Sequence, residues 1–190
     1  MSKSMKKALM AVVAGAALTG AVSAQAQVGE IYEAGNSGNP LTTADGTFSG
    51  TTTLAYGGGP NITCTLTLDG TVEVDSGGAT GRITVTDGDI SGGFLCGLVS
   101  ISGFPWVSND VAASDLAPIS SVAQDVDIVF EDQIDVNLCG NDLDFTAVFN
   151  NNGTTVNSAP STFEVSNTLG SCSLVGTLTV QGDDIDAVQN

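Results

Sequence analysis

The stretch Ile62-Thr63-Cys64-Thr65-Leu66-Thr67-Leu68-Asp69 decides the fold of this chain. Apolar side chains stand at every second position from Ile62 to Leu68, and threonines fill the positions between them. Because successive side chains of a β-strand point to opposite faces, this alternation predicts a half-buried strand. Cys64 belongs to the apolar set and is therefore expected to point inward.

Segments on both sides of this stretch repeat the alternation, and almost none has the period of a helix. The apolar positions of these predicted strands are Ile83 and Val85; Val126, Ile128 and Phe130; Ile134, Val136 and Leu138; and Leu143, Phe145, Ala147 and Phe149. Gly and Asn cluster at 57–60, 77–78, 92–93 and 151–153, where they predict tight turns. We expect an all-β fold, an antiparallel β-sandwich or a partly closed barrel, with one short helix between Ser108 and Pro118.

The chain contains one tryptophan, Trp106, which follows Gly103-Phe104-Pro105. A lone tryptophan beside proline is expected to plug one end of a β core. The alternative is an exposed aromatic ring that binds a sugar or an apolar ligand.

The chain also contains four cysteines, Cys64, Cys96, Cys139 and Cys172. In an oxidising compartment they are expected to form two disulfides. Of the three connectivities we favour Cys64 with Cys96 and Cys139 with Cys172, because the two intervals are nearly equal. Each closed loop would stabilise the fold by about 3–4 kcal/mol. No pair has the C-x-x-C spacing that zinc sites use.

The first 26 residues have the pattern of a secretory signal peptide. Lys3, Lys6 and Lys7 precede an apolar run from Ala8 to Val22, and small residues follow it. The run is shorter than the ~20 residues of a membrane span. Cleavage is expected after Ala26, with Ala24 as the alternative, so that the mature protein is secreted to the extracellular space or the cell surface.

Residues 27–45 are predicted to form an extended N-terminal arm, and residues 46–190 a single β-domain. Gly and Asn between Gly35 and Pro40 separate the short run Val28 to Ala34 from the domain. Such an arm could add a strand to the sheet edge of a neighbouring molecule through Val28, Ile31, Tyr32 and Ala34. Because this head-to-tail contact need not close, the product would be a homopolymeric filament. A mobile tail is the alternative.

The composition excludes most kinds of catalysis and several kinds of partner. Without the signal peptide, Arg82 is the only basic residue against 21 acidic ones, a formal charge near −20, and the chain has no His. This charge excludes nucleic acid and anionic membranes as electrostatic partners. Ser and Cys nucleophiles lack an imidazole base, and Schiff-base chemistry lacks a lysine. No catalytic residues are assigned, and a carboxylate pair of the glycosidase kind is the surviving enzymatic alternative.

Three acidic clusters offer closely spaced oxygen ligands of the kind that calcium takes from flexible loops. They are Asp87-Gly88-Asp89, Asn141-Asp142-Leu143-Asp144 and Asp183-Asp184-Ile185-Asp186. We assign Asp87, Asp89, Asp142 and Asp144 as candidate calcium ligands, with solvated turn and strand-end acids as the alternative. No other cofactor is expected.

The contexts of the four cysteines resemble those of a known family, the secreted activators of alkane oxidation, or PraB-like proteins. The segments that carry the resemblance are Ile62-Thr63-Cys64-Thr65, Phe94-Leu95-Cys96-Gly97-Leu98 with Phe104-Pro105-Trp106, Cys139-Gly140, and Ser171-Cys172-Ser173-Leu174. The likeness extends from about Gly46 to Val180. It implies an exported bacterial protein associated with growth on long-chain hydrocarbons and with biofilm, and fibre formation by strand donation. It carries over no catalytic residues. This chain departs from the family by its acidity, which argues against simple adsorption to hydrocarbon droplets.

We hold two functional hypotheses, neither of them enzymatic. The first is a structural subunit of an extracellular filament, assembled by donation of the N-terminal strand and supporting adhesion or biofilm. The second is a soluble secreted binding or surface-active accessory protein for the use of hydrophobic substrates such as alkanes. Fibres that need Val28 to Ala34 would favour the first, and a monomer that lowers interfacial tension would favour the second.

Overall fold

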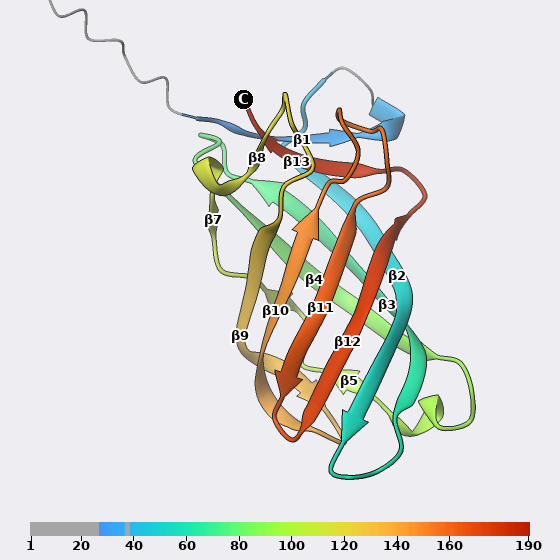
Figure 1. Ribbon diagram of the computed structural model, residues 1–190. Coiled ribbons are helices and arrows are strands. Elements are labelled where there is room, and N and C mark those ends of the chain that lie inside the picture. Colours follow the sequence, from blue (N-terminus) through green and yellow to red (C-terminus); the bar gives the residue numbers. More distant parts are fainter. Residues whose placement is uncertain (1–26, 37–38) are drawn as a thin grey trace, which may run out of the picture.

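The computed structural model describes residues 27–36 and 39–190; the predicted signal peptide lies outside this range. Seven long antiparallel strands form one curled sheet with the order β9-β10-β11-β12-β2-β3-β4 (Figure 1). Their bounds are β2 Thr43–Tyr56, β3 Ile62–Val74, β4 Thr80–Ser91, β9 Val126–Val136, β10 Gly140–Asn150, β11 Thr162–Leu169 and β12 Cys172–Gln181. The predicted all-β fold, a partly closed barrel, is confirmed.

The helical content of the described residues is confined to three single turns of 3-10 helix. They are η1 Ala34–Asn36, η2 Cys96–Leu98 and η3 Ala113–Asp115. The helix expected between Ser108 and Pro118 is therefore only η3, which follows the two-residue strand β7 Val111–Ala112. Across residues 27–36 and 39–190, no helix is long and apolar enough to cross a bilayer.

The segment from Ser100 to Asn109 fills the gap between the first and last long strands, β9 and β4. Within it, β5 Ile101–Ser102 pairs with β9, and β6 Trp106–Val107 pairs with β4. The N–H of Ser108 donates to the carbonyl of Ile83 on β4 (2.9 Å), and that of Asn109 to the carbonyl of Val129 on β9 (2.8 Å). One connecting segment thus closes the curled sheet toward a barrel.

The inward faces of the strands form one apolar core, as the alternation predicts. Trp106 is 3% exposed and stacks on Phe104 with ring centroids 4.3 Å apart, and its Nε1 donates to the carbonyl of Ser102 (3.0 Å). Trp106 is therefore a core residue, and the alternative of an exposed ligand-binding ring is wrong.

Two predicted strands, Val126–Phe130 and Ile134–Leu138, fall on one strand, β9, which has an irregularity at its centre and ends at Val136, so that Leu138 lies in the following turn. Leu143 of β10 lies opposite Ile134, whereas Phe145 lies opposite Phe130, so β9 holds extra residues between these pairs. Asp132 adopts a positive φ of 52° there, and its N–H donates to Asp144 Oδ1 (3.0 Å). This bulge preserves the inward-facing apolar set on both sides of it.

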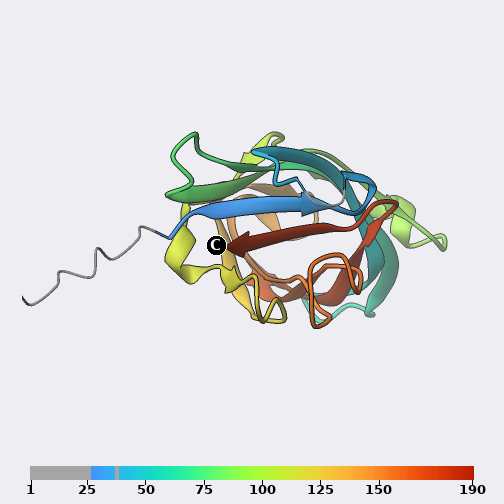
Figure 2. The same ribbon diagram turned by 90° about the horizontal axis from the view of Figure 1, so that it is seen from above.

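A second, three-stranded sheet lies across one end of the barrel, and we call it the cap (Figure 2). It contains β1 Gly29–Glu33, β13 Ile185–Gln189 and β8 Ala117–Pro118, with β13 in the middle. Ile31 of β1 is fully buried, and Ile185 and Ala187 of β13 join the same apolar core. The cap therefore covers the open end of the barrel with side chains of its own.

The expected free N-terminal arm is part of this cap. Gly29 to Glu33 pair antiparallel with Gln189 to Ile185 of the same chain, and Ile31 and Leu41 form a further bridge. The main sheet begins at Thr43, opposite Glu73. Sequence reasoning placed residues 27–45 apart from the domain because the Gly-rich stretch breaks regular structure, yet the strand in front of it finds its partner within the same molecule.

Candidate functional site: an apolar tip held by disulfides

All four cysteines lie at the barrel end opposite the cap. Cys64, near the start of β3, joins Cys96 in η2, and Cys139, in the turn after β9, joins Cys172 at the start of β12. These are the favoured pairings. Because each bond links residues more than thirty positions apart, this end of the molecule is the most strongly cross-linked.

The loop from Gly92 to Leu98, which we call the apolar tip, projects from this end (Figure 1). Three large apolar side chains of the loop face solvent: Phe94 is 88% exposed, Leu98 52% and Leu95 38%. Phe94 is the most exposed large hydrophobic side chain of the described residues. Exposed apolar side chains that gather in one place mark contact surfaces more often than scattered ones do.

The apolar tip has an ordered backbone. The N–H groups of Cys96, Leu98 and Val99 donate to the carbonyls three positions earlier, at 2.9, 3.1 and 3.0 Å. Cys96 is buried and its disulfide fixes the loop to β3. A side chain at Gly92, with φ of 133°, would come within 3.0 Å of Cys96 Sγ, so glycine is needed where the loop leaves β4.

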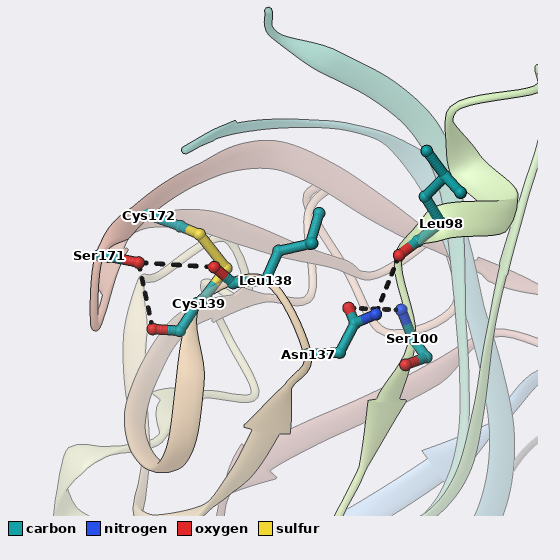
Figure 3. Close-up of a disulfide and its surroundings, with 7 residues drawn as sticks. All are labelled: Leu98, Ser100, Asn137, Leu138, Cys139, Ser171 and Cys172. Atoms are coloured by element: carbon teal, nitrogen blue, oxygen red, sulfur yellow. Dashed lines mark hydrogen bonds between the residues drawn. A yellow bond between two sulfur atoms is a disulfide. The ribbon is translucent and has the colours of Figure 1, made fainter. Parts of the chain in front are cut away.

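Asn137, at the end of β9, fastens the other side of the apolar tip (Figure 3). Its Nδ2 donates to the carbonyl of Leu98 (2.9 Å), and its Oδ1 accepts the N–H of Ser100 (3.0 Å). Ser171 Oγ donates to the carbonyl of Cys139 (3.3 Å) beside the second disulfide. The turns of β9–β10 and β11–β12 therefore form a braced platform for the tip.

The tip is also electrically neutral in a strongly acidic chain. No charged residue occurs between Asp89 and Asp110, although the whole chain has 21 acidic residues. The apolar side chains thus face solvent from an uncharged stretch of twenty residues. An uncharged, apolar partner would meet the least electrostatic resistance at this place.

Among the described residues, the apolar spaces within the barrel are small. The apolar spaces near Trp106, near Cys64 and near Leu116 measure about 30, 40 and 30 Å³, each close to the volume of a single water molecule. The larger hollows, of about 460 and 570 Å³, are open grooves lined by carboxylates such as Asp110 and Asp183. The exposed apolar side chains of the tip lie outside all of these spaces.

The predicted contact residues of the arm are divided by the cap. Val28 and Ala34 are exposed, Tyr32 is half-buried, and Ile31 is completely buried between the cap and the barrel. These side chains do not form one free apolar face. Strand donation would require β1 to leave β13 and to expose Ile31, and nothing in this structure favours that exchange.

The candidate calcium ligands lie on two different strands. Asp87 and Asp89 are exposed on β4, and Asp142 and Asp144 are exposed on β10. Asp87 Oδ1 accepts the N–H of Gly88 (2.8 Å), and Asp144 Oδ1 holds the β9 bulge. Within the described ranges, no three Asp, Glu, His or Cys side chains gather as a metal site. Calcium at these four residues stays a prediction.

Sequence reasoning did not assign Phe94 and Leu98 to a site. Their segment carries part of the family resemblance, and its apolar residue types are those of a buried strand. The available signal was the lack of both charge and alternation from Ile90 to Asn109, which distinguishes this stretch from the surrounding strands.

Comparison with protein families matches residues 1–184 to the family described as alkane oxidation protein activator PraA/PraB-like. No curated protein and no solved structure matches the chain.

Proposed function

Because the chain belongs to the PraA/PraB-like family of alkane oxidation protein activators, we propose that it is a secreted, non-enzymatic accessory protein that contacts hydrophobic substrates such as alkanes. The apolar tip is the contact surface. The single observation that carries the proposal is the 88% exposure of Phe94 on a loop fixed by a disulfide.

The energetics favour a contact at the surface of a hydrocarbon phase. Full burial of a Phe or Leu side chain stabilises by about 1.5–3 kcal/mol relative to full exposure. Given their exposures, immersion of Phe94, Leu98 and Leu95 would contribute on the order of 4 kcal/mol before the cost of association. Since the loop is already ordered by Cys96 and Asn137, little conformational entropy is lost on contact.

The acidity of the chain would keep the rest of the molecule in water while the apolar tip contacts the hydrocarbon. Simple adsorption of an anionic surface to hydrocarbon is unfavourable, but the tip provides one uncharged place while the acidic body stays in water. Molecules adsorbed by their tips would present their carboxylates outward. The resulting negative layer would keep droplets apart by like-charge repulsion, which increases the area that cells can reach.

The filament hypothesis has less support than this accessory role. It depends on an N-terminal arm that is separable from the domain, whereas β1 pairs with β13 over five residues of the same chain. The compartment still agrees with both hypotheses, since the two disulfides require an oxidising environment to form.

The test is the tension of a hexadecane–water interface, measured by pendant drop with purified mature protein. We expect the wild type to lower the tension as a monomer and the double variant Phe94→Ser, Leu98→Ser to lose most of this effect. Val175→Ser is the matched control, because Val175 is 48% exposed on β12, outside the tip. Circular dichroism verifies that all three are folded. Equal activity of wild type and tip variant would refute the proposal.

A further inference from the structure

Two carboxylates are buried on the face of the cap that is turned away from the barrel, at the end of the molecule opposite the apolar tip. Asp186 of β13 is 1% exposed, and Asp184, just before β13, is 9% exposed. Residues two apart on an extended chain point to the same side, so both carboxylates face away from the barrel core that Ile185 and Ala187 enter. Since burial of an unpaired charge is costly, these two groups require a compensating partner.

The loop between β10 and β11 covers the two carboxylates, and its hydrogen bonds satisfy only one oxygen of each. Asp184 Oδ1 accepts the N–H and the hydroxyl of Ser161, both at 2.8 Å, and the N–H of Ile185 at 3.0 Å. Asp186 Oδ2 accepts the N–H of Asn157. The second oxygens, Asp184 Oδ2 and Asp186 Oδ1, are buried without a partner.

A third buried oxygen at this place also has no partner, the side-chain carbonyl Oδ1 of Asn157. Three buried acceptors, two of them carboxylate oxygens, are therefore without a partner at one place. Asn157 is hydrogen-bonded to Asp186, and Asp184 precedes Asp186 by two positions. Buried acceptors in folded proteins almost always have a donor or a cation.

A shared proton would relieve the site only in part. Protonation of one carboxyl group would remove one negative charge and leave the other carboxylate buried. One proton also joins one donor oxygen to one acceptor and leaves the third oxygen of the set unsatisfied. A divalent cation neutralises both carboxylates, and all three oxygens can coordinate it at once.

We propose that Asp184, Asp186 and Asn157 bind one calcium ion between β13 and the β10–β11 loop. The oxygen-only ligand set is that of a hard cation. Because only two carboxylates take part, the affinity belongs to the weak, extracellular range, with Kd of about 10⁻⁴–10⁻³ M. The ion would fasten the loop to the cap and so stabilise the closed end of the barrel, independently of the proposed interfacial role of the tip.

The experiment titrates calcium chloride into mature protein freed of metal by chelation, with calorimetry and thermal unfolding as readouts. We expect one site, and a rise in Tm of about 3–6 °C at ten times the Kd. Asp184→Asn and Asp186→Asn should abolish both. Asp183→Asn, the same charge change at the exposed neighbouring position, should retain both.

The wild-type titration decides the proposal even if a variant fails to fold. Absence of heat and of a Tm shift at about 10 mM calcium would overturn it and leave a shared proton as the explanation. Binding that survives in both Asp184→Asn and Asp186→Asn would also overturn it, because the ion would then lie elsewhere. Interfacial tension is measured in parallel, so that failure of this site and failure of the tip proposal are distinguished.

Discussion

Gln133 and Val107 exchange two hydrogen bonds, side chain to backbone. Nε2 of Gln133 donates to the carbonyl of Val107 (2.8 Å), and the N–H of Val107 donates to Oε1 of Gln133 (2.6 Å). The side-chain amide thus makes the two hydrogen bonds that the backbone of a neighbouring strand would otherwise make, at the place where β6 meets β9. The bulge at Asp132 lies directly before Gln133, and one glutamine therefore helps to close the barrel.

Replacement of this glutamine should weaken the closure. Gln133→Leu keeps the size of the side chain but leaves both polar groups of Val107 without their partner, so we expect a loss of about 2–3 kcal/mol in the free energy of unfolding. Urea denaturation measures it. Gln181→Leu is the control, since Gln181 is exposed on β12, and should change stability by less than about 0.5 kcal/mol. Equal effects of the two changes would show that the amide contact is not needed.

The burial of Ile31 predicts that the N-terminal strand stabilises its own domain. Ile31→Ala removes a fully buried side chain between cap and barrel and should cost about 2–5 kcal/mol. Val28→Ala, at the exposed start of the segment, should cost little. Thermal unfolding of the monomer compares them. If the arm were mobile or donated to a neighbour, neither change would affect the stability of the isolated monomer, and the two variants would unfold at the same temperature as the wild type.

Removal of either disulfide should lower stability, but only removal of the disulfide at the apolar tip should also lower interfacial activity. Each encloses a loop of about the same length, so Cys64→Ala with Cys96→Ala and Cys139→Ala with Cys172→Ala should each cost about 3–4 kcal/mol. Only the first pair releases the apolar tip, and only that variant should show weakened lowering of interfacial tension under conditions where both remain folded. If the two variants lower the tension equally, the order of the tip does not matter for contact.

Asp186 should make the metal-free protein less stable as pH rises from about 4 to about 7. Burial is the main cause of its raised pKa, Asp184 adds to it, and the N–H of Asn157 opposes it. With a pKa of about 7 in the folded state against 3.8 ordinarily, the folded state holds a proton in this window that the unfolded state has released. The free energy of unfolding therefore falls with pH, by up to about 4 kcal/mol, and levels off above pH 7.

Urea titrations across this range, with chelator present, compare the wild type with Asp186→Asn. The variant should show a flatter dependence, whereas Asp183→Asn should keep the decline. The same slope for wild type and Asp186→Asn would mean that other carboxylates dominate the pH dependence.

The strands and the disulfide pairing could be predicted because their signals are local. Alternation in Ile62 to Leu68 reports one buried face wherever the strand lies, and the near-equal cysteine intervals suffice to favour one connectivity. The cap could not be predicted in this way. The alternation around Ile31 is the same whether the partner strand belongs to a neighbour or, as observed, to residues 185–189 of the same chain.

The functional side chains depend on tertiary structure still more. Phe94 and Leu98 are typical core residues by type, and only the position of η2 at the end of the barrel leaves them in solvent. Asp184 and Asp186 have the pattern of solvated strand-end acids, yet the loop around Asn157 folds over them. Exposure of an apolar residue and burial of a charged one are properties of packing, which periodicity does not encode.

Val28 and Asn190 exchange two backbone hydrogen bonds, at 3.3 and 2.9 Å. These bonds join the two ends of the described chain on the cap, at the end of the barrel opposite the apolar tip (Figure 1). A fluorescent label or a tether fused to Asn190 would therefore leave the opposite end unobstructed, and protein immobilised through that residue would point Phe94 into the medium. The same proximity permits circular permutation, with a short linker across Val28 and Asn190 and new ends opened in the exposed Gly57–Pro60 turn.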